Sequence, residues 1–329
     1  MSYRVYIPCD TSAVAVGADK VAASLKSEAE RLGLEVDIIR NGSRGMFWLE
    51  PMLEVVTPQG RVAYGPVRKT DIARLLEADF LQGGDHPLKL GLTEDIPFLK
   101  NQERLTFARV GVTNPTSLTD YEANGGWAGL RAALTIPADA IVAAVTASGL
   151  RGRGGAAFPA GIKWQTVLKA AGTQKYIVCN ADEGDSGTFS DRMLMEGDPY
   201  CLIEGMIIAG LAVGATQGYI YLRSEYPRAF KTLQEAIAKA SASGFLGDNI
   251  LKSGQAFHLE VRLGAGAYIC GEETALLESL EGKRGQVRAK PPLPAISGLF
   301  GKPTVVNNVV TLASVPIILA KGADFYAHY

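Results

Sequence analysis

Hydrophobic and polar residues are patterned in two different ways along this chain, which predicts two regions of different architecture. The first region is predicted to hold two strands separated by a helix, then a hairpin and a short helix. These elements are expected at residues 3–8, 17–32, 34–40, 52–58 with 61–67, and 69–79. In the second region, apolar runs of strand length alternate with longer helical segments. Strands are expected there at 175–180, 218–223 and 257–263, and helices at 118–123, 127–134, 138–147, 191–213, 226–243 and 272–281.

The order of elements in the first region is that of a thioredoxin-like domain, which we place at residues 1–85. Redox chemistry is not expected there, because Cys9 is followed by Asp10, Thr11 and Ser12 and no second thiol is near. We therefore expect a docking domain without redox activity. The turn-rich residues 86–104 are predicted to be a linker.

The regular alternation in the second region, residues 105–329, predicts an α/β domain with a parallel sheet and crossover helices. Binding sites in such sheets lie at the carboxyl ends of the strands. The loops of this chain that are rich in glycine and polar residues fall at those ends, so binding residues are expected there.

Composition narrows the class of protein. The chain has 33 Lys+Arg and 34 Asp+Glu, a net charge of −1, which argues against nucleic-acid binding and an electrostatic membrane anchor. Its four cysteines form no CxxC pair and its three histidines stand apart, so no metal site is predicted. The uncharged run 205–222 contains several glycines and is predicted to be a helix end, a turn and a strand, not a membrane span. No signal-peptide pattern is present, and we expect a cytoplasmic protein.

Four loops follow the predicted elements, and the first spans 149–164. Its glycines let backbone N–H groups approach an anion. Cations and an aromatic ring stand among them, which favours a phosphate cradle with a stacking platform over a flexible surface loop. The residues concerned are Arg151, Gly152, Arg153, Gly154, Gly155, Phe158 and Lys163.

The second loop places polar side chains directly after a buried strand. Asn180, Asp182, Glu183 and Asp185 supply oxygens that accept hydrogen bonds from sugar hydroxyls or from the edge of a ring. The alternative is a solvated turn with side-chain caps. Because the glycine loop is expected close by, we interpret this loop as a contact for a ribityl chain, a ribose or a nicotinamide.

The third loop runs through glycines into a helix that begins with Glu272 and Glu273. Ile269 stands where the last glycine of a GxGxxG motif would be, so a standard dinucleotide fingerprint is absent. The two glutamates on their own are explained by the helix dipole. Tyr268 and Gly271 indicate a binding role in addition, because an aromatic ring and a glycine suit a flat ligand that passes close to the backbone.

The fourth loop is rich in proline and carries Lys290, so we expect a rigid loop. Asn307, Asn308 and Thr311 are predicted to open a helix and to contact a phosphate there. Helix capping is the alternative role of these three residues.

The residues of these loops form no Ser/His/Asp or Cys/His catalytic set, so no side chain is assigned as catalytic. Glu183 and Glu273 are the nearest candidates. The loops instead offer contacts for phosphate and hydroxyl groups around the position of a flat ligand. That arrangement suits a reaction in which cofactors carry the chemistry and the protein aligns them.

Together the four loops closely resemble the NADH-oxidising 51 kDa flavin subunit of respiratory complex I, from about Leu105 to Tyr329. The same module occurs in NAD-reducing hydrogenases and in NAD-dependent molybdenum or tungsten formate dehydrogenases. The resemblance implies a Rossmann-like domain that binds FMN and NAD(H) in one cleft. It also implies hydride transfer between the two and single-electron exchange with iron–sulfur clusters. The family's ubiquitin-like domain and its [4Fe–4S] domain are expected only beyond the residues present.

The resemblance assigns cofactor contacts residue by residue. The implied FMN contacts are Gly152, Arg153, Gly154, Lys163, Asn180, Asp182, Glu183, Gly271, Glu272, Asn307, Asn308 and Thr311. The implied NAD(H) contacts are Phe158, Asp185, Tyr268, Glu273 and Lys290. Carboxylates near the adenine ribose would repel a 2′-phosphate, which favours NAD over NADP.

The chain departs from the complex I pattern at three places. Asp185-Ser186 replaces Glu-Pro, Ala157 replaces a glycine, and Leu293 stands where an aromatic residue stacks on adenine. The NADEGDSG form and the N-terminal extension without cluster cysteines are most similar to the β (diaphorase) subunit of soluble NAD-dependent formate dehydrogenase.

That similarity implies a heteromeric complex with two partners: a molybdenum/tungsten catalytic α subunit and a small [2Fe–2S] thioredoxin-like γ subunit. Formate oxidation in the partner would then drive NAD⁺ reduction. Two alternatives share the same chemistry, the diaphorase subunit of a NAD-reducing hydrogenase and the input subunit of an NADH:quinone oxidoreductase. A non-catalytic nucleotide-binding module is the alternative from another class.

Overall fold

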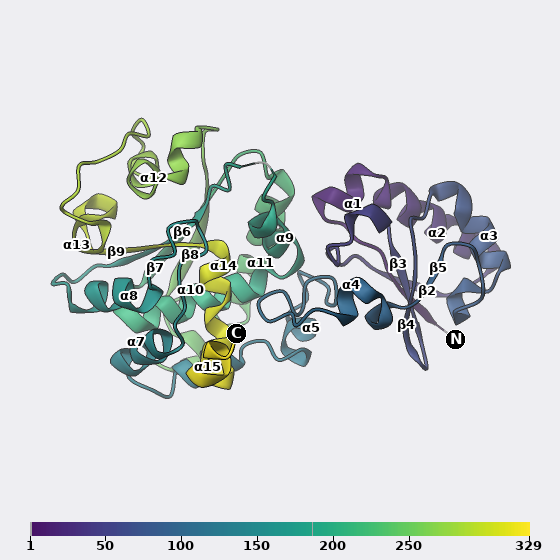
Figure 1. Cartoon of the computed structure of the whole chain (residues 1–329), viewed down its shortest axis with the longest axis horizontal. Helices are drawn as coiled ribbons and strands as arrows, with labels where there is room; N and C mark the ends of the chain where they lie inside the picture. The colour runs from purple at the N-terminus through teal and green to yellow at the C-terminus, as the bar shows by residue number, and fades with distance from the viewer. Residues whose placement is uncertain (1, 186) are drawn as a thin grey trace. The chain divides into compact units, whose positions relative to one another are not determined.

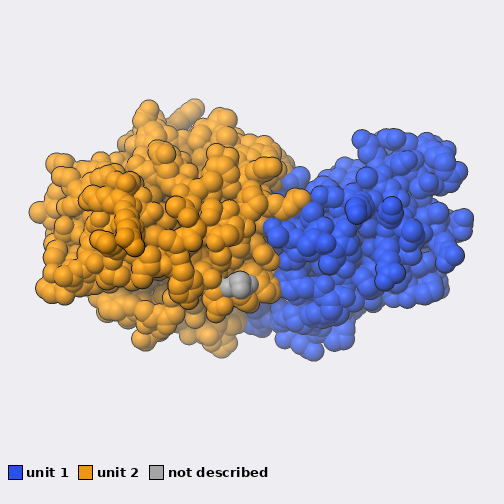
Figure 2. All heavy atoms as spheres, turned by 90° about the horizontal axis from the view of Figure 1, so that it is seen from above, with its two compact units in different colours: residues 1–115 blue, residues 116–329 orange. Residues whose placement is uncertain are grey.

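The chain folds into two compact units, residues 1–115 and residues 116–329 (Figure 2). The computed structural model describes residues 2–185 and 187–329. Ser186, one half of a predicted departure from the complex I pattern, lies outside the described residues. Figure 1 shows the helices and strands of both units.

The N-terminal unit is built on a mixed five-stranded sheet. Its strands are β1 (Tyr3–Tyr6), β2 (Val36–Ile39), β3 (Leu53–Thr57), β4 (Gly60–Tyr64) and β5 (Lys89–Leu92), in the order β2-β1-β3-β4-β5. The β1–β2 pair is parallel and the other pairs are antiparallel. This is the predicted thioredoxin-like arrangement of two parallel strands followed by a hairpin. The edge strand β5 lies within 86–104, the stretch for which the sequence predicted a linker.

The α-helices of this unit, within its described residues, are α1 (Thr11–Ala15), α2 (Ala18–Leu32), α3 (Ile72–Glu77) and α4 (Pro97–Lys100). The longest, α2, forms where Val21, Leu25 and Ala29 recur every four residues and become buried. It ends at Gly33, whose φ of 67° is the left-handed conformation that glycine adopts without strain. The apolar face of α2 thus packs into the core of this unit, with Val5, Leu53 and Tyr64 from the sheet among its members.

The second unit is built on a parallel four-stranded sheet, which confirms the predicted α/β class. Its strands are β6 (Tyr176–Ala181), β7 (Gln217–Leu222), β8 (His258–Leu263) and β9 (Thr304–Asn308), in the order β8-β7-β6-β9. All three pairings are parallel. The chain therefore proceeds outward from β6 to β8 and then returns to the other side of β6.

The strand β9 corrects the prediction for the fourth loop. Residues 304–308 were expected in a rigid loop that ends in a helix, but they pair with β6 along its length. The run is only five residues long and follows Pro303, so its local pattern carries little strand signal. Its pairing with a distant strand decides its conformation.

Most helices between residues 118 and 280 match the predicted positions. The short helix at 294–297 corrects the prediction of a rigid loop there, and the helices at 315–321 and 323–327 were not predicted. The helices of this unit are α5 (Leu118–Ala123), α6 (Ala128–Ala133), α7 (Ala138–Ala147), α8 (Ala160–Lys169), α9 (Ser190–Gly197), α10 (Pro199–Val213), α11 (Pro227–Ala242), α12 (Glu273–Leu280), α13 (Pro294–Ser297), α14 (Val309–Ala313), α15 (Val315–Lys321) and α16 (Ala323–Ala327). The predicted helix over 191–213 is two helices, because Asp198 has φ −152° and Pro199 opens a new first turn.

The uncharged run 205–222 resolves as predicted. It consists of the end of the buried helix α10, a turn at Gly214 with φ 73°, and the strand β7. None of the helices within the described ranges combines the length and apolarity that a membrane crossing requires.

Candidate functional site

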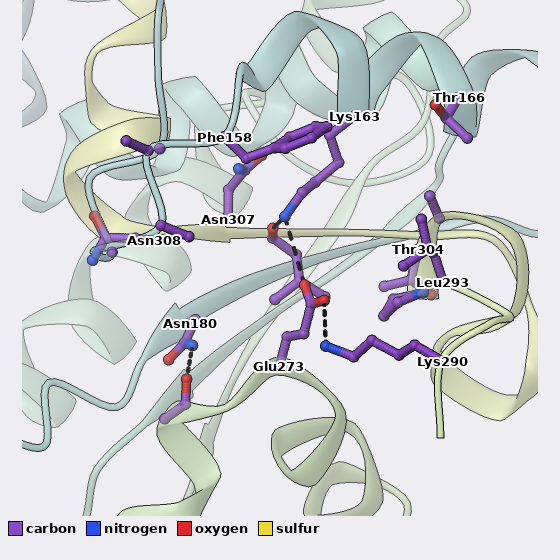
Figure 3. A pocket seen from close by; sticks show the side chains of 18 residues that line it. Phe158, Lys163, Thr166, Asn180, Glu273, Lys290, Leu293, Thr304, Asn307 and Asn308 are labelled. Atoms are coloured by element: carbon purple, nitrogen blue, oxygen red, sulfur yellow. Dashed lines mark hydrogen bonds and ion pairs between the residues drawn. The ribbon is translucent and has the colours of Figure 1, made fainter. Parts of the chain in front are cut away.

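A pocket of the second unit lies where the order of strands in the sheet reverses. In the strand order β8-β7-β6-β9, the chain leaves β6 on one side and comes back on the other. The carboxyl ends of β6 and β9 are adjacent there, with Asn180 opposite Asn308 in the register. Open parallel sheets bind ligands in the crevice at such a switch point. A pocket of about 470 Å³ opens at this point, within the size range of small-molecule sites (Figure 3).

The predicted glycine loop forms one wall of the pocket. Gly152, Gly154 and Phe158 line it, and α8 begins directly after the loop. The loop is folded back on itself, because Gly152 N donates to Phe158 O at 2.9 Å. A Cβ atom on Gly154 would lie 3.2 Å from the Cβ of Asn308. Glycine therefore lets the loop approach the end of β9 closely.

Ala157 in the same loop adopts a conformation that favours glycine. Its φ is 50°, in the left-handed region, and its side chain lines the pocket. This is the position where the complex I pattern has glycine. Ala157, which departs from the complex I pattern in sequence, is thus a strained residue in the structure.

A chain of opposite charges crosses the pocket (Figure 3). Lys163 Nζ lies 3.6 Å from Glu273 Oε2 and donates to Val306 O at 2.7 Å. Lys290 Nζ donates to Glu273 Oε1 at 3.1 Å and to Glu272 Oε1 at 2.9 Å. Burial lowers the pKa of Lys163, and Glu273 only partly offsets this effect. The pocket thus contains two ammonium groups whose partners in this structure are carboxylates.

Glu272 is held as an anion at the start of α12. Its Oε2 accepts from the N–H groups of Thr274 and Ala275 and from the Thr274 hydroxyl. Burial would raise the pKa of Glu272, but hydrogen bonds from Thr274, Lys290 and Ala275 outweigh burial and lower it to about 2. Glu272 therefore caps the N-terminus of α12.

The three asparagines at the strand ends have defined partners. Asn180 Nδ2 donates to Gly271 O at 2.8 Å, which ties β6 to the third loop. Asn307 Oδ1 accepts from Trp164 Nε1 at 2.8 Å. Asn308 Oδ1 accepts from Val310 N and caps α14. The expectation that Asn307 and Asn308 open a helix is corrected: both belong to β9, and only Asn308 acts as the cap.

Glu183 follows Asn180 closely in sequence, but it does not line the pocket. It is buried and accepts from Ser190 Oγ and from the N–H groups of Asp191 and Arg192 at the start of α9. The Tyr226 hydroxyl donates to it as well, at 3.0 Å. These contacts make Glu183 an anchor for α9 in this structure.

Asp182 differs from Glu183 in having an unused oxygen. Its Oδ2 is buried and has no hydrogen-bond partner among the described residues. Burial raises the pKa of Asp182 to about 6, against the opposing charge of Arg223. A Cβ on Gly271 would lie 3.9 Å from this oxygen, so Asp182 lies just behind the glycine that lines the pocket.

The structure brings most of the predicted cofactor residues together. Ten of them line the pocket, namely Gly152, Gly154, Phe158, Lys163, Asn180, Gly271, Glu273, Lys290, Asn307 and Asn308. Seven do not line it, namely Arg153, Asp182, Glu183, Asp185, Tyr268, Glu272 and Thr311.

Several of these seven nevertheless support the lining residues. Thr311 Oγ1 accepts from Arg153 N at 2.8 Å and so fastens the glycine loop to α14. Tyr268 is 76% exposed, and its ring lies over Gly184. Asp185 is exposed. The lining also includes Thr166, Thr304 and Ala295, which sequence reasoning did not select because a single Thr or Ala in a helix or strand has many roles.

Asp191 is a residue that sequence reasoning missed. It is 4% exposed, and its Oδ2 accepts from Asn308 Nδ2 at 2.7 Å. Burial and the nearby Glu183 raise the pKa of Asp191 to about 7. An aspartate in the first turn of a helix is common, so its position along the chain carried no signal.

No group of three or more His, Cys, Asp or Glu side chains in the described part of the chain is arranged to hold a metal ion. The four cysteines, all within the described residues, form no disulfide, and Cys179, Cys201 and Cys270 are buried.

Comparisons with known proteins agree with this geometry. Residues 145–317, which contain all the lining residues, match the family model described as Complex1_51K, the Nuo51 FMN-binding domain. An NADH-quinone oxidoreductase chain of Rhizobium meliloti (strain 1021) is 53% identical over 225 residues, which are 68% of this chain and 53% of that protein. The HndC chain of the NADP-reducing hydrogenase of Solidesulfovibrio fructosivorans is 51% identical over 228 residues, 69% of this chain and 46% of that protein.

Among solved structures, a NAD⁺-reducing [NiFe]-hydrogenase in the H₂-reduced state matches with a TM-score of 0.56 and 31% identity. The match covers 98% of this chain and 53% of the hydrogenase chain. The present chain thus spans about half the length of the relatives that it matches. By the extent of the family match and the site within it, the chain belongs to the Nuo51 FMN-binding family of complex I 51 kDa subunits.

Proposed function

We propose that the pocket between β6 and β9 binds FMN and that the chain exchanges a hydride between NAD(H) and this flavin. The observation that carries the proposal is the position of the pocket. It lies at the switch point of a parallel sheet and combines a glycine wall, three asparagines and two lysines. The family match supports the flavin, because the matching domain is described as FMN-binding.

The residues present suit a flavin mononucleotide. Asp182 Oδ2 is a buried acceptor that lacks a partner among the described residues, and an acceptor in this state favours a ligand that donates to it. Gly152, Gly154 and Gly271 leave backbone exposed on the pocket side, which permits a flat ring to lie close. Lys163 and Lys290 offer positive charge to an anionic ligand.

When bound, FMN would accept a hydride from the nicotinamide and would pass on the two electrons of that hydride one at a time. The protein's part is alignment. Lys163 is fixed by Val306 O and Glu273, so its ammonium has one defined position in the pocket. Phe158 is 50% exposed at the pocket wall, where its ring offers a face for stacking. No side chain has to remove a proton from carbon, so proximity is the main catalytic factor.

For the electron partner, we favour a hydrogenase or an NADH:quinone oxidoreductase of the kind found among the relatives. The match to the NAD⁺-reducing hydrogenase supports a hydrogenase-like assembly further, because it covers 98% of the chain and so includes the N-terminal unit. The sequence form NADEGDSG remains the observation in favour of a formate dehydrogenase with molybdenum/tungsten α and [2Fe–2S] γ subunits.

The experiment is purification of the native complex under mild conditions. It should contain FMN, reduce ferricyanide with NADH, and include the catalytic partner among its copurifying chains. A hydrogenase or quinone-linked partner supports the favoured assignment, and a molybdenum or tungsten subunit supports the formate assignment. A complex without flavin that leaves ferricyanide oxidised would contradict the proposal and favour a non-catalytic nucleotide-binding module.

A further inference from the structure

The segment between α12 and α13, residues 281–293, forms part of the pocket wall without any helix or strand. We call it the strap. Lys290 and Leu293 line the pocket from the strap, and Lys290 contacts Glu272 and Glu273 at the start of α12. Figure 3 shows the contact with Glu273. A segment without regular structure needs side-chain contacts to keep one conformation.

Arg288 supplies those contacts from the middle of the strap. Its Nε donates to Glu278 Oε1 at 2.5 Å, and its Nη2 donates to Glu281 Oε1 at 2.8 Å. Its Nη1 donates to Gly298 O at 2.9 Å. Glu281 is the C-cap of α12 and Gly298 is the C-cap of α13, so one guanidinium joins the ends of both helices. The Arg288 side chain is 25% exposed, and such charge-assisted, forked contacts are stronger than neutral hydrogen bonds.

A second set of contacts connects Arg288 to the pocket. Its backbone N–H donates to Thr274 Oγ1 at 2.9 Å, and that hydroxyl donates to Glu272 Oε2 at 2.6 Å. The other oxygen of Glu272 accepts from Lys290, two residues beyond Arg288. The strap is thus tied to the start of α12 at Arg288 and again at Lys290, the residue that enters the pocket.

We propose that Arg288 is a positioning residue that holds the strap against α12 and so presents Lys290 to the nicotinamide nucleotide. The inference rests on the proposed function. Without the guanidinium, Glu278 and Glu281 keep only the ion pairs with Lys283 near the start of the strap. The part of the strap that carries Lys290 then samples conformations in which Lys290 is outside the pocket. Apparent affinity falls in proportion to the fraction of molecules in the competent conformation.

The test replaces Arg288 by Lys, which keeps the charge but cannot contact Glu278, Glu281 and Gly298 at once. Arg284→Lys is the matched control, since Arg284 is an exposed residue of the same strap and makes none of these contacts. A milder second variant is Thr274→Val, which removes only the bridging hydroxyl. The flavin-containing complex of each variant is titrated with NAD⁺, and hydrogen exchange of the strap amides is measured without nucleotide.

Arg288→Lys should weaken NAD⁺ binding by about fivefold or more, by reducing the competent fraction, while kcat at saturating NADH stays within about twofold. Strap amides should exchange faster in this variant, Thr274→Val should give a smaller change in the same direction, and Arg284→Lys should match the wild type. Unchanged affinity and exchange in Arg288→Lys would overturn the inference. So would faster exchange throughout the domain, because that result indicates a structural role alone. A wild-type complex that binds no NAD⁺ contradicts the proposed function itself, and the exchange data distinguish the two failures.

Discussion

Asn180 and Asn308 stand opposite each other in the register of β6 and β9, at the carboxyl ends of two parallel strands. Each also fastens another part of the site. Asn180 donates to Gly271 O in the third loop, and Asn308 donates to Asp191 in α9. Segments distant in sequence therefore meet at one pair of side chains, and the pocket depends on this pair for its shape.

Replacement of Asn308 by Leu should destabilise the domain and weaken flavin binding. It removes the cap of α14 and leaves the buried Asp191 without its amide donor. Loss of a cap costs about 1 kcal/mol and an unsatisfied buried acceptor about 1–3 kcal/mol. Urea unfolding of the flavin-free protein measures this loss. A free energy of unfolding equal to that of the wild type would show that the Asn308 contacts carry no stability.

Replacement of Lys163 by Ala should reduce flavin retention. The ammonium is held in the pocket by Val306 O and Glu273, so its removal deletes a fixed positive charge. Flavin recovered after extensive dilution measures the effect, with Lys169→Ala, an exposed lysine of the same helix α8, as the control. Full flavin occupancy of Lys163→Ala at nanomolar protein would refute the role of Lys163.

Asp191 should make the stability of the flavin-free protein depend on pH. Burial raises its pKa in the folded state from the ordinary value of 3.8 to about 7, so the folded protein binds more protons than the unfolded chain between these values. The contribution of this group to stability is then complete at low pH and is lost as pH rises toward 7. Asp191→Asn removes the titration and keeps an acceptor for Asn308.

The difference in unfolding free energy between Asp191→Asn and the wild type should therefore shift in favour of the variant by about 1–3 kcal/mol from pH 5 to pH 8. Urea unfolding at several pH values measures it. A difference that stays constant with pH would contradict a raised pKa at Asp191.

Ala157→Gly should stabilise the chain. Ala157 has φ 50°, a conformation that costs a non-glycine residue about 1–2 kcal/mol, whereas the added flexibility of glycine in the unfolded chain costs about 0.5–1 kcal/mol. We expect the free energy of unfolding, measured by thermal unfolding, to rise by about 0.5–1 kcal/mol. Ala156→Gly is the control: Ala156 has no positive φ and also lines the pocket, so its replacement should destabilise instead. A loss of stability in both variants would show that Ala157 is not strained.

The local pattern was sufficient for the parts of the fold that depend on neighbours in sequence. The strands β6, β7 and β8 and the helices between them have strong periodicity, and their positions were predicted within a few residues. The strand β9 was not, because Thr304–Asn308 is short and becomes a strand only through its pairing with β6. Long-range pairing leaves little trace in a short segment.

The site shows the same division. The glycine loop and Asn180 were selected correctly as residues that come together at one pocket, because glycines, cations and polar side chains at strand ends are unusual in composition. The orientation of Glu183 was not foreseeable, since it depends on Tyr226 and on the start of α9. Asp191 was missed because its contact with Asn308 is a consequence of tertiary packing.

The most direct test of the central claim is a high-resolution map of the protein after saturation with FMN. The account predicts flavin density in the pocket at the ends of β6 and β9, in contact with the loop of Gly152 and Gly154. Flavin density at another place, or a pocket without flavin density at full flavin occupancy, would contradict it.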